Sequence, residues 1–167
     1  EVRKFVDLVD GRVKIIPLVE TPEAVEIIDD ILKLDIDEIF IGLNDLSLGY
    51  GKKFMFELLS DGTVEKITDR IKCKDIPFGF GGLASLNGGL LPGRMVLQEH
   101  YRLGSSSVIL SRTFCNMNHQ TDLSEIEKIF INGVAEIRNY EQELLCMDEY
   151  IINKENVRKA VKTIVEG

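Results

Sequence analysis

Apolar residues follow two periodicities along the chain, and the two alternate. Short runs rich in β-branched or aromatic residues predict buried strands, whereas apolar residues three or four positions apart predict amphipathic helices. The predicted strands are VKIIPLV at 13–19, IFI at 39–41, PFGFGG at 77–82 and SSVILS at 106–111. The predicted helices lie at 2–9, 22–31, 53–59, 63–72, 91–103, 122–147 and 153–166.

Local signals mark several helix ends. Thr21 is a favourable N-cap, and Pro22 takes the first helical position, where its missing N–H costs nothing. Gly104 follows the helix predicted at 91–103 and is expected to end it. The segment GLNDLSLGYG after the second strand is read as a loop.

The alternation of strands and helices predicts an α/β fold with a parallel sheet, because each crossover helix returns the chain to the same end of the sheet. The predicted strands are short and apolar throughout, which is typical of strands covered on both faces. Two architectures meet these conditions, a doubly wound sheet and a (β/α)8 barrel of the TIM type. Four βα units make only half of such a barrel.

Composition and charge exclude several classes of protein. The 167 residues include 28 acidic and 20 basic side chains, for a net charge of −8, and the scattered bases argue against nucleic acid as a partner. Three cysteines without a CxxC pair favour neither a disulfide framework nor a zinc site. No apolar run is long enough to span a membrane. We therefore expect a single soluble globular domain in the cytoplasm, with no membrane partner.

Two carboxylates stand where predicted strands give way to the next segment. Glu20 follows VKIIPLV, and Asp45 follows IFIGLN one βα unit later. Parallel strands end on one edge of the sheet, so the two side chains can converge on one hard cation, Mg²⁺ or Mn²⁺. The alternative is that Glu20 only caps a helix and Asp45 only holds its own loop.

The segments LVETPEAVEIIDDIL and IDEIFIGLNDLSLGYG resemble the HpcH/HpaI aldolase and citrate lyase β-subunit family, whose members use pyruvate or phosphoenolpyruvate. The V-E-T at one strand end and the I-G-x-x-D-L-S one βα unit later carry the resemblance, which extends over about residues 1–115. It implies a TIM-type barrel of which this chain holds about the last four βα units. Residues 1–121 would form the half barrel with the metal-site loops, and 122–167 a C-terminal helical extension.

The resemblance also implies a chemistry. Glu20 and Asp45 match the family's metal ligands, and the backbone of Gly42, Leu43, Asn44 and Asp45 matches the loop that holds the substrate carboxylate. The implied function is a metal-dependent carbon–carbon lyase or aldolase that acts on a pyruvate-like or oxaloacetate-like α-keto acid through a metal-stabilised enolate. The family's arginine and general-base histidine lie upstream of Glu1, so the isolated chain is expected to be a poor catalyst.

Other candidates have ordinary alternatives. Arg112 follows SVILS and is a candidate catalytic group, although an ion pair with a neighbouring acid is the commoner role of such an arginine. His119 lies in a polar loop without a recognisable motif. Gly79 and Gly81 fit a loose dinucleotide-binding pattern, but they favour close packing because no acid ends a following strand.

A second function class stays open. Four strands would leave two sheet edges unpaired, so the chain could instead be a non-catalytic half barrel that binds metal or partner chains. Pairing of two copies would cover these edges, and the helices after Asp122 would form a second contact. We therefore expect a homo-oligomer in either case.

Overall fold

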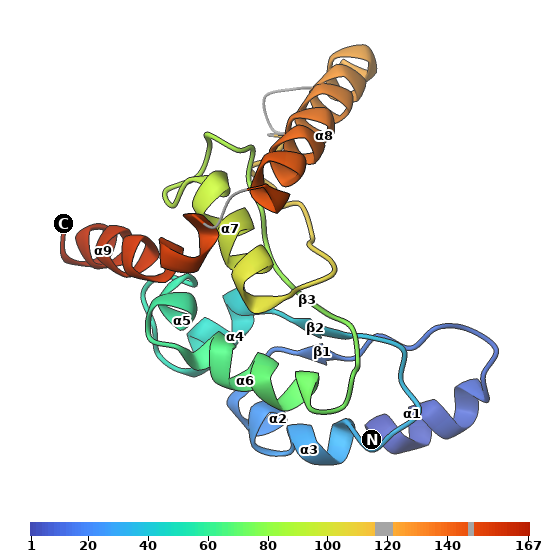
Figure 1. Ribbon diagram of the computed structural model, residues 1–167. Coiled ribbons are helices and arrows are strands. Elements are labelled where there is room, and N and C mark those ends of the chain that lie inside the picture. Colours follow the sequence, from blue (N-terminus) through green and yellow to red (C-terminus); the bar gives the residue numbers. More distant parts are fainter. Residues whose placement is uncertain (116–121, 147–148) are drawn as a thin grey trace.

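The structure, a computed structural model, describes residues 1–115, 122–146 and 149–167. At its centre lies one parallel sheet, β1 (Leu18–Val19), β2 (Ile39–Ile41) and β3 (Phe78–Phe80), in the order β1-β2-β3 (Figure 1). Leu18 pairs with Phe40, and Phe40 pairs in turn with Gly79. All three strands therefore end at the same edge of the sheet.

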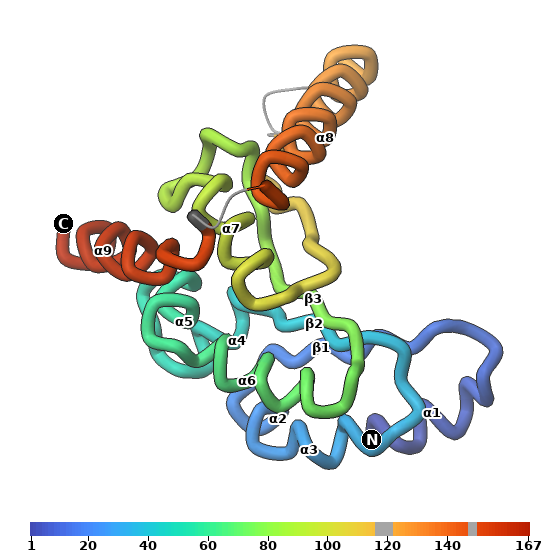
Figure 2. Tube along the Cα trace, viewed as in Figure 1, coloured from blue at the N-terminus to red at the C-terminus, as the bar shows by residue number. Residues whose placement is uncertain are grey.

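Helices make up most of the remaining structure. Figure 1 and the chain trace in Figure 2 show α8 pointing away from the sheet, whereas α9 packs beside α5 and α7. No described helix is both long and apolar enough to cross a membrane. The helices are α1 (Val2–Val9), α2 (Pro22–Glu26), α3 (Ile28–Ile31), α4 (Leu43–Gly49), α5 (Glu57–Ser60), α6 (Thr63–Lys72), α7 (Gly93–Leu103), α8 (Leu123–Leu145), the 3₁₀ helix η1 (Glu149–Ile152) and α9 (Asn153–Glu166).

The predicted helix ends are confirmed. Thr21 Oγ1 accepts a hydrogen bond from the Ala24 N–H at 3.2 Å, and Pro22 takes the first position of α2. Gly104 follows α7 with a φ of 74°, a left-handed conformation that glycine adopts without a steric cost. These features depend only on neighbouring residues, so the local sequence specifies them.

The expected fold class, half of a TIM-type barrel built from four βα units, is wrong. The residues that the structure describes are 56% helical and contain one sheet of three strands. The fourth predicted strand, 106–111, makes only two isolated parallel bridges, Gly79 with Ser107 and Leu83 with Leu110. Gly79 and Leu83 are four residues apart, whereas their partners Ser107 and Leu110 are three residues apart. The pairing therefore slips by one residue, and no continuous ladder forms.

Serine residues hold this segment beside β3. The Ser106 N–H and hydroxyl both donate to the Phe78 carbonyl, at 2.8 and 3.1 Å, and the Ser107 hydroxyl donates to the Glu38 carboxylate. The segment 106–111 therefore lies beside β3 without becoming a strand of the sheet.

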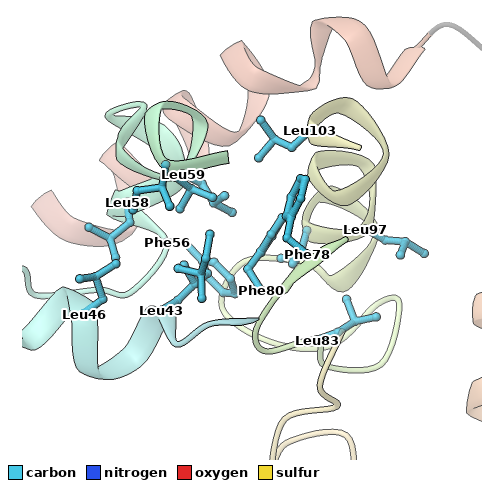
Figure 3. Close-up of a cluster of buried hydrophobic side chains, with 14 of the residues drawn as sticks. Leu43, Leu46, Phe56, Leu58, Leu59, Phe78, Phe80, Leu83, Leu97 and Leu103 are labelled. Atoms are coloured by element: carbon cyan, nitrogen blue, oxygen red, sulfur yellow. The ribbon is translucent and has the colours of Figure 1, made fainter. Parts of the chain in front are cut away.

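The hydrophobic core lies between the sheet and the helices. Residues of β2 and β3 pack against α4, α5, α6 and α7, and Figure 3 shows several of the side chains involved. Val157 and Val161 of α9 belong to the same cluster. On the opposite face of β1, Leu18 is 52% exposed while its neighbour Val19 is fully buried. The sheet is thus covered well on one face and partly open on the other.

A charged cluster ties α9 to this core. The carboxylate of the fully buried Glu99 forms an ion pair with Arg102 at 2.7 Å and accepts a hydrogen bond from the Asn153 amide at 2.9 Å. Arg102 also contacts Glu65 of α6 at 2.7 Å, and Lys154 of α9 contacts the same carboxylate. Hydrogen bonding from Lys154 and Arg102 lowers the pKa of Glu65. We call Glu65, Glu99, Arg102, Asn153 and Lys154 the Glu99 cluster.

We expect Glu99→Gln to lower the free energy of unfolding by about 3 kcal/mol, because it removes the fully buried counter-charge of Arg102 and leaves only the ion pair with Glu65. The measurement is urea unfolding near pH 7. Glu125→Gln removes an exposed i,i+3 pair with Lys128 and should cost less than about 1 kcal/mol. Equal losses in the two variants would contradict a special role of the Glu99 cluster.

His100 of α7 is buried in the core rather than at the surface. Its ring stacks on Phe80 with the centroids 3.6 Å apart, and its Nδ1 lies 2.8 Å from Ser105 Oγ. Its Nε2 is buried and has no hydrogen-bond partner. Burial lowers the pKa of His100 to about 3, because the charged imidazolium cannot be solvated there.

The unfolded chain therefore binds a proton at His100 at a higher pH than the folded chain does. We expect the free energy of unfolding to fall as the pH drops from about 6.5 towards about 3, by up to about 1.4 kcal/mol per unit. Urea unfolding at pH 5.0 to 7.5 checks this range, where most carboxylates stay ionised. His100→Gln should flatten the profile, and an unchanged slope would show that other groups cause it.

Candidate functional site

The segment that follows β2 is a helix, not the loop that the sequence predicts. Helix α4 begins directly after Gly42, its N-cap, and its first turn contains Asp45. Leu43 and Leu46 are buried in the core, three positions apart on the same side of the helix. The loop prediction overlooked this leucine spacing and the acid in the first turn, which are the signals of a helix in this segment.

Glu20 lies against the start of α4. It follows Val19 of β1, whose carbonyl accepts a hydrogen bond from the Gly42 N–H at 3.0 Å. A Cβ atom added at Gly42 would come within 2.8 Å of Glu20 Cβ and 2.9 Å of Glu20 Oε2. The missing side chain at Gly42 thus leaves the space that the half-buried Glu20 side chain occupies.

Asp45 lies on the exposed side of the same helix start. Its Oδ1 accepts a hydrogen bond from the Asn44 amide at 3.2 Å. The N–H groups of Leu43, Asn44 and Asp45 belong to the first turn, where a helix offers no carbonyl partner of its own. The structure therefore places Glu20 against Gly42, at the start of the helix whose first turn contains Leu43, Asn44 and Asp45.

A cavity of about 200 Å³ opens beside this edge. Its wall is mostly apolar, and its polar side chains are Asn44 and Asp45. None of the described residues that line it is Lys, Arg or His. The lining residues are Leu18, Phe40, Gly42, Leu43, Asn44, Asp45, Met55, Gly81, Gly82 and Ile109. The cavity therefore offers negative charge and apolar surface, without a basic side chain.

Arg112 lies outside this cavity. It is exposed in the turn after Ser111, and in the described parts of the chain it makes no ion pair. The ion pair with a neighbouring acid that the sequence favours is thus not found among these residues. His119 lies outside the described residues.

Gly79 and Gly81 serve close packing. A Cβ at Gly79 would meet Phe40 Cε2 at 2.8 Å, and one at Gly81 would meet Phe40 Cε1 at 3.2 Å. The Phe40 ring therefore lies over both glycines. This contact is the packing role that the sequence favours over a dinucleotide-binding role.

The donor set at the edge fits a magnesium-like ion with few protein ligands. Within 1–115, 122–146 and 149–167, no group of three or more His, Cys, Asp or Glu side chains is placed to hold a metal. Mg²⁺ commonly uses one or two carboxylates and keeps several waters or substrate oxygens. Glu20, seated in the gap at Gly42, and Asp45 on the first turn of α4 offer carboxylates of this kind.

Comparisons with known proteins found no match. No family model matches the chain, and neither a curated protein nor a solved structure matches it.

We expect Gly42→Ala to lower the free energy of unfolding by about 1 to 3 kcal/mol, because the new methyl group overlaps the Glu20 side chain. The backbone itself adds no strain, since Gly42 has a φ of −80°. The measurement is urea unfolding of the single variants and of the double variant with Glu20→Gly. In the Glu20→Gly background the cost should largely disappear, and full additivity would contradict the contact.

Proposed function

We propose that this chain binds Mg²⁺ or Mn²⁺ through Glu20 and Asp45 and contributes this ion to a carbon–carbon lyase or aldolase site for a pyruvate-like or oxaloacetate-like acid. The resemblance of the V-E-T and I-G-x-x-D-L-S segments to the HpcH/HpaI aldolase and citrate lyase β-subunit family motivates the choice of reaction. The proposal concerns the residues at the sheet edge and does not depend on a barrel.

The observation that carries the proposal is the position of Glu20 against Gly42 at the start of α4. This contact holds one carboxylate over the strand ends, and the first turn of the helix supplies Asp45. Both residues come from segments that directly follow neighbouring parallel strands. Hard oxygen ligands of this kind are those that Mg²⁺ and Mn²⁺ prefer.

Electrostatics supports the need for a cation. An α-keto acid is an anion. Asp45 lines the cavity and Glu20 lies against the lining residue Gly42, and these carboxylates repel an anion when no positive charge compensates them. The described lining residues contain no basic side chain that could do so. A bound divalent ion would supply positive charge to polarise the keto oxygen and offset charge that develops as a carbon–carbon bond breaks or forms.

The remaining groups at the edge have roles that their positions allow. The N–H groups of Leu43, Asn44 and Asp45 can donate to the substrate carboxylate, because they have no helical carbonyl partners. The apolar side chains of Phe40 and Met55 line the cavity and limit the access of water to a small ligand.

A second candidate is a metal-binding or assembly module without turnover. The same absence of Lys, Arg and His among the described lining residues favours it, since general acid–base catalysis needs a group to move the proton. Arg112 is exposed and lies away from the lining. Both candidates use the same metal ligands and differ in catalysis.

We expect millimolar Mg²⁺ or Mn²⁺ to stabilise the chain, by about 2.7 kcal/mol when the free ion is at one hundred times its dissociation constant. Glu20→Gln and Asp45→Asn should each abolish most of this shift, as measured by urea unfolding with metal or with EDTA. Glu26→Gln changes an exposed acid of α2 and serves as the control. Identical unfolding curves with metal and with EDTA would reject the metal site.

The same proteins decide between the two candidates in an assay of oxaloacetate decarboxylation with Mn²⁺. Turnover above that of free Mn²⁺, lost in Asp45→Asn and kept in Glu26→Gln, supports the lyase. Because the isolated chain is expected to be a poor catalyst, the lack of turnover alone does not decide. Metal-dependent stabilisation that added oxaloacetate leaves unchanged, without turnover, supports the module.

A further inference from the structure

Helix α8 carries apolar side chains that the described chain leaves uncovered. Its buried residues are Ile137, Tyr140 and Leu144, all towards its C-terminal end. Its N-terminal half projects from the molecule (Figures 1 and 2), and there Ile131 is 60% exposed and Val134 is 37% exposed. Adjacent apolar side chains on a projecting helix are typical of an interaction surface.

Charged residues flank this apolar pair with a regular spacing. Glu127 precedes Ile131 by four residues, and Arg138 follows Val134 by four. Spacings of four, three and four place all four side chains along one side of the helix. Glu127 is exposed. The Arg138 side chain is 72% exposed, and its guanidinium also lies 2.7 Å from the carboxylate of Glu141 on the same helix. We call Glu127, Ile131, Val134 and Arg138 the α8 stripe.

The α8 stripe is complementary to itself when two copies of the helix run antiparallel. With Ile131 of one copy opposite Val134 of the other, the equal spacings place Glu127 opposite Arg138, and the two-fold axis repeats both pairs. A parallel arrangement would set Glu127 against Glu127 and Arg138 against Arg138. The order of charges along the helix thus favours one orientation of a second copy.

Charge also argues against a membrane as the occupant. Helix α8 contains five glutamates and two basic residues, whereas helices that lie on membrane surfaces are rich in Lys and Arg on the polar face.

We propose that α8 forms a homodimer with a second copy of the chain, through antiparallel contact of the α8 stripe. The contact is compact, so the dimer is expected to exchange with the monomer and to depend on concentration. The charge pairs between Glu127 and Arg138 of the two copies determine the orientation of the dimer. Reversing one of these charges creates two like-charge contacts in the symmetric dimer.

Sedimentation velocity over a range of protein concentrations tests the proposal with the full chain. Val134→Asp and Glu127→Arg should each raise the dissociation constant of the dimer at least about tenfold. The double variant Glu127→Arg with Arg138→Glu restores opposite charges and should return the constant to within about threefold of the original. Circular dichroism of each variant checks that α8 remains helical.

Glu136→Arg is the matched control. It makes the same change of charge at an exposed position of α8, about half a turn around the helix from Glu127. It should leave the dissociation constant within about threefold. A monomer at every concentration, a dimer insensitive to Val134→Asp and Glu127→Arg, or a double variant without recovery would each overturn the proposal.

Discussion

The complete burial of the central strand β2 is the constraint on which the rest of the structure depends. Ile39 and Ile41 are fully buried against the helices, and Phe40 packs on the opposite side over Gly79 and Gly81. A strand in this position must satisfy its backbone groups on both sides, and it does so with β1 and β3 in parallel pairing. This pairing aligns the strand ends, so that Glu20 and the start of α4 meet at one edge.

The parts of the fold that the sequence predicts well are those with local causes. Thr21, Pro22 and Gly104 set helix ends through contacts with their own neighbours, and the run IFI marks β2 by its composition. The run SSVILS has an equally strand-like composition, yet its pairing with β3 slips by one residue between Gly79 and Leu83. A slip of this kind arises from two segments together, so the pattern of either one alone does not reveal it.

The candidate site likewise has features that the sequence predicts and features that depend on contacts between distant segments. The placement of Glu20 and the start of α4 at one edge follows from parallel topology, which the order of strands and helices predicts. The gap at Gly42 that admits the Glu20 side chain depends on two segments in register, and the helical conformation of Asp45 depends on Leu43 and Leu46 reaching the core. The Glu99 cluster is harder still to predict, because it joins Glu65 of α6, Glu99 of α7 and Asn153 of α9 across long stretches of chain. The amphipathic pattern of one helix does not predict contacts between helices that are far apart in the sequence.

Charge compensation differs between the Glu99 cluster and the strand edge. In the Glu99 cluster the carboxylates of Glu65 and Glu99 have internal partners in Arg102 and Lys154, so their charge is already compensated. On α8, Glu125 pairs with Lys128 and Glu141 pairs with Arg138. Glu20 and Asp45 have no ion pair among the described residues, and the cavity beside them has no basic lining residue there. In the proposed metal site, a divalent ion would supply the positive charge that the described residues lining this edge do not.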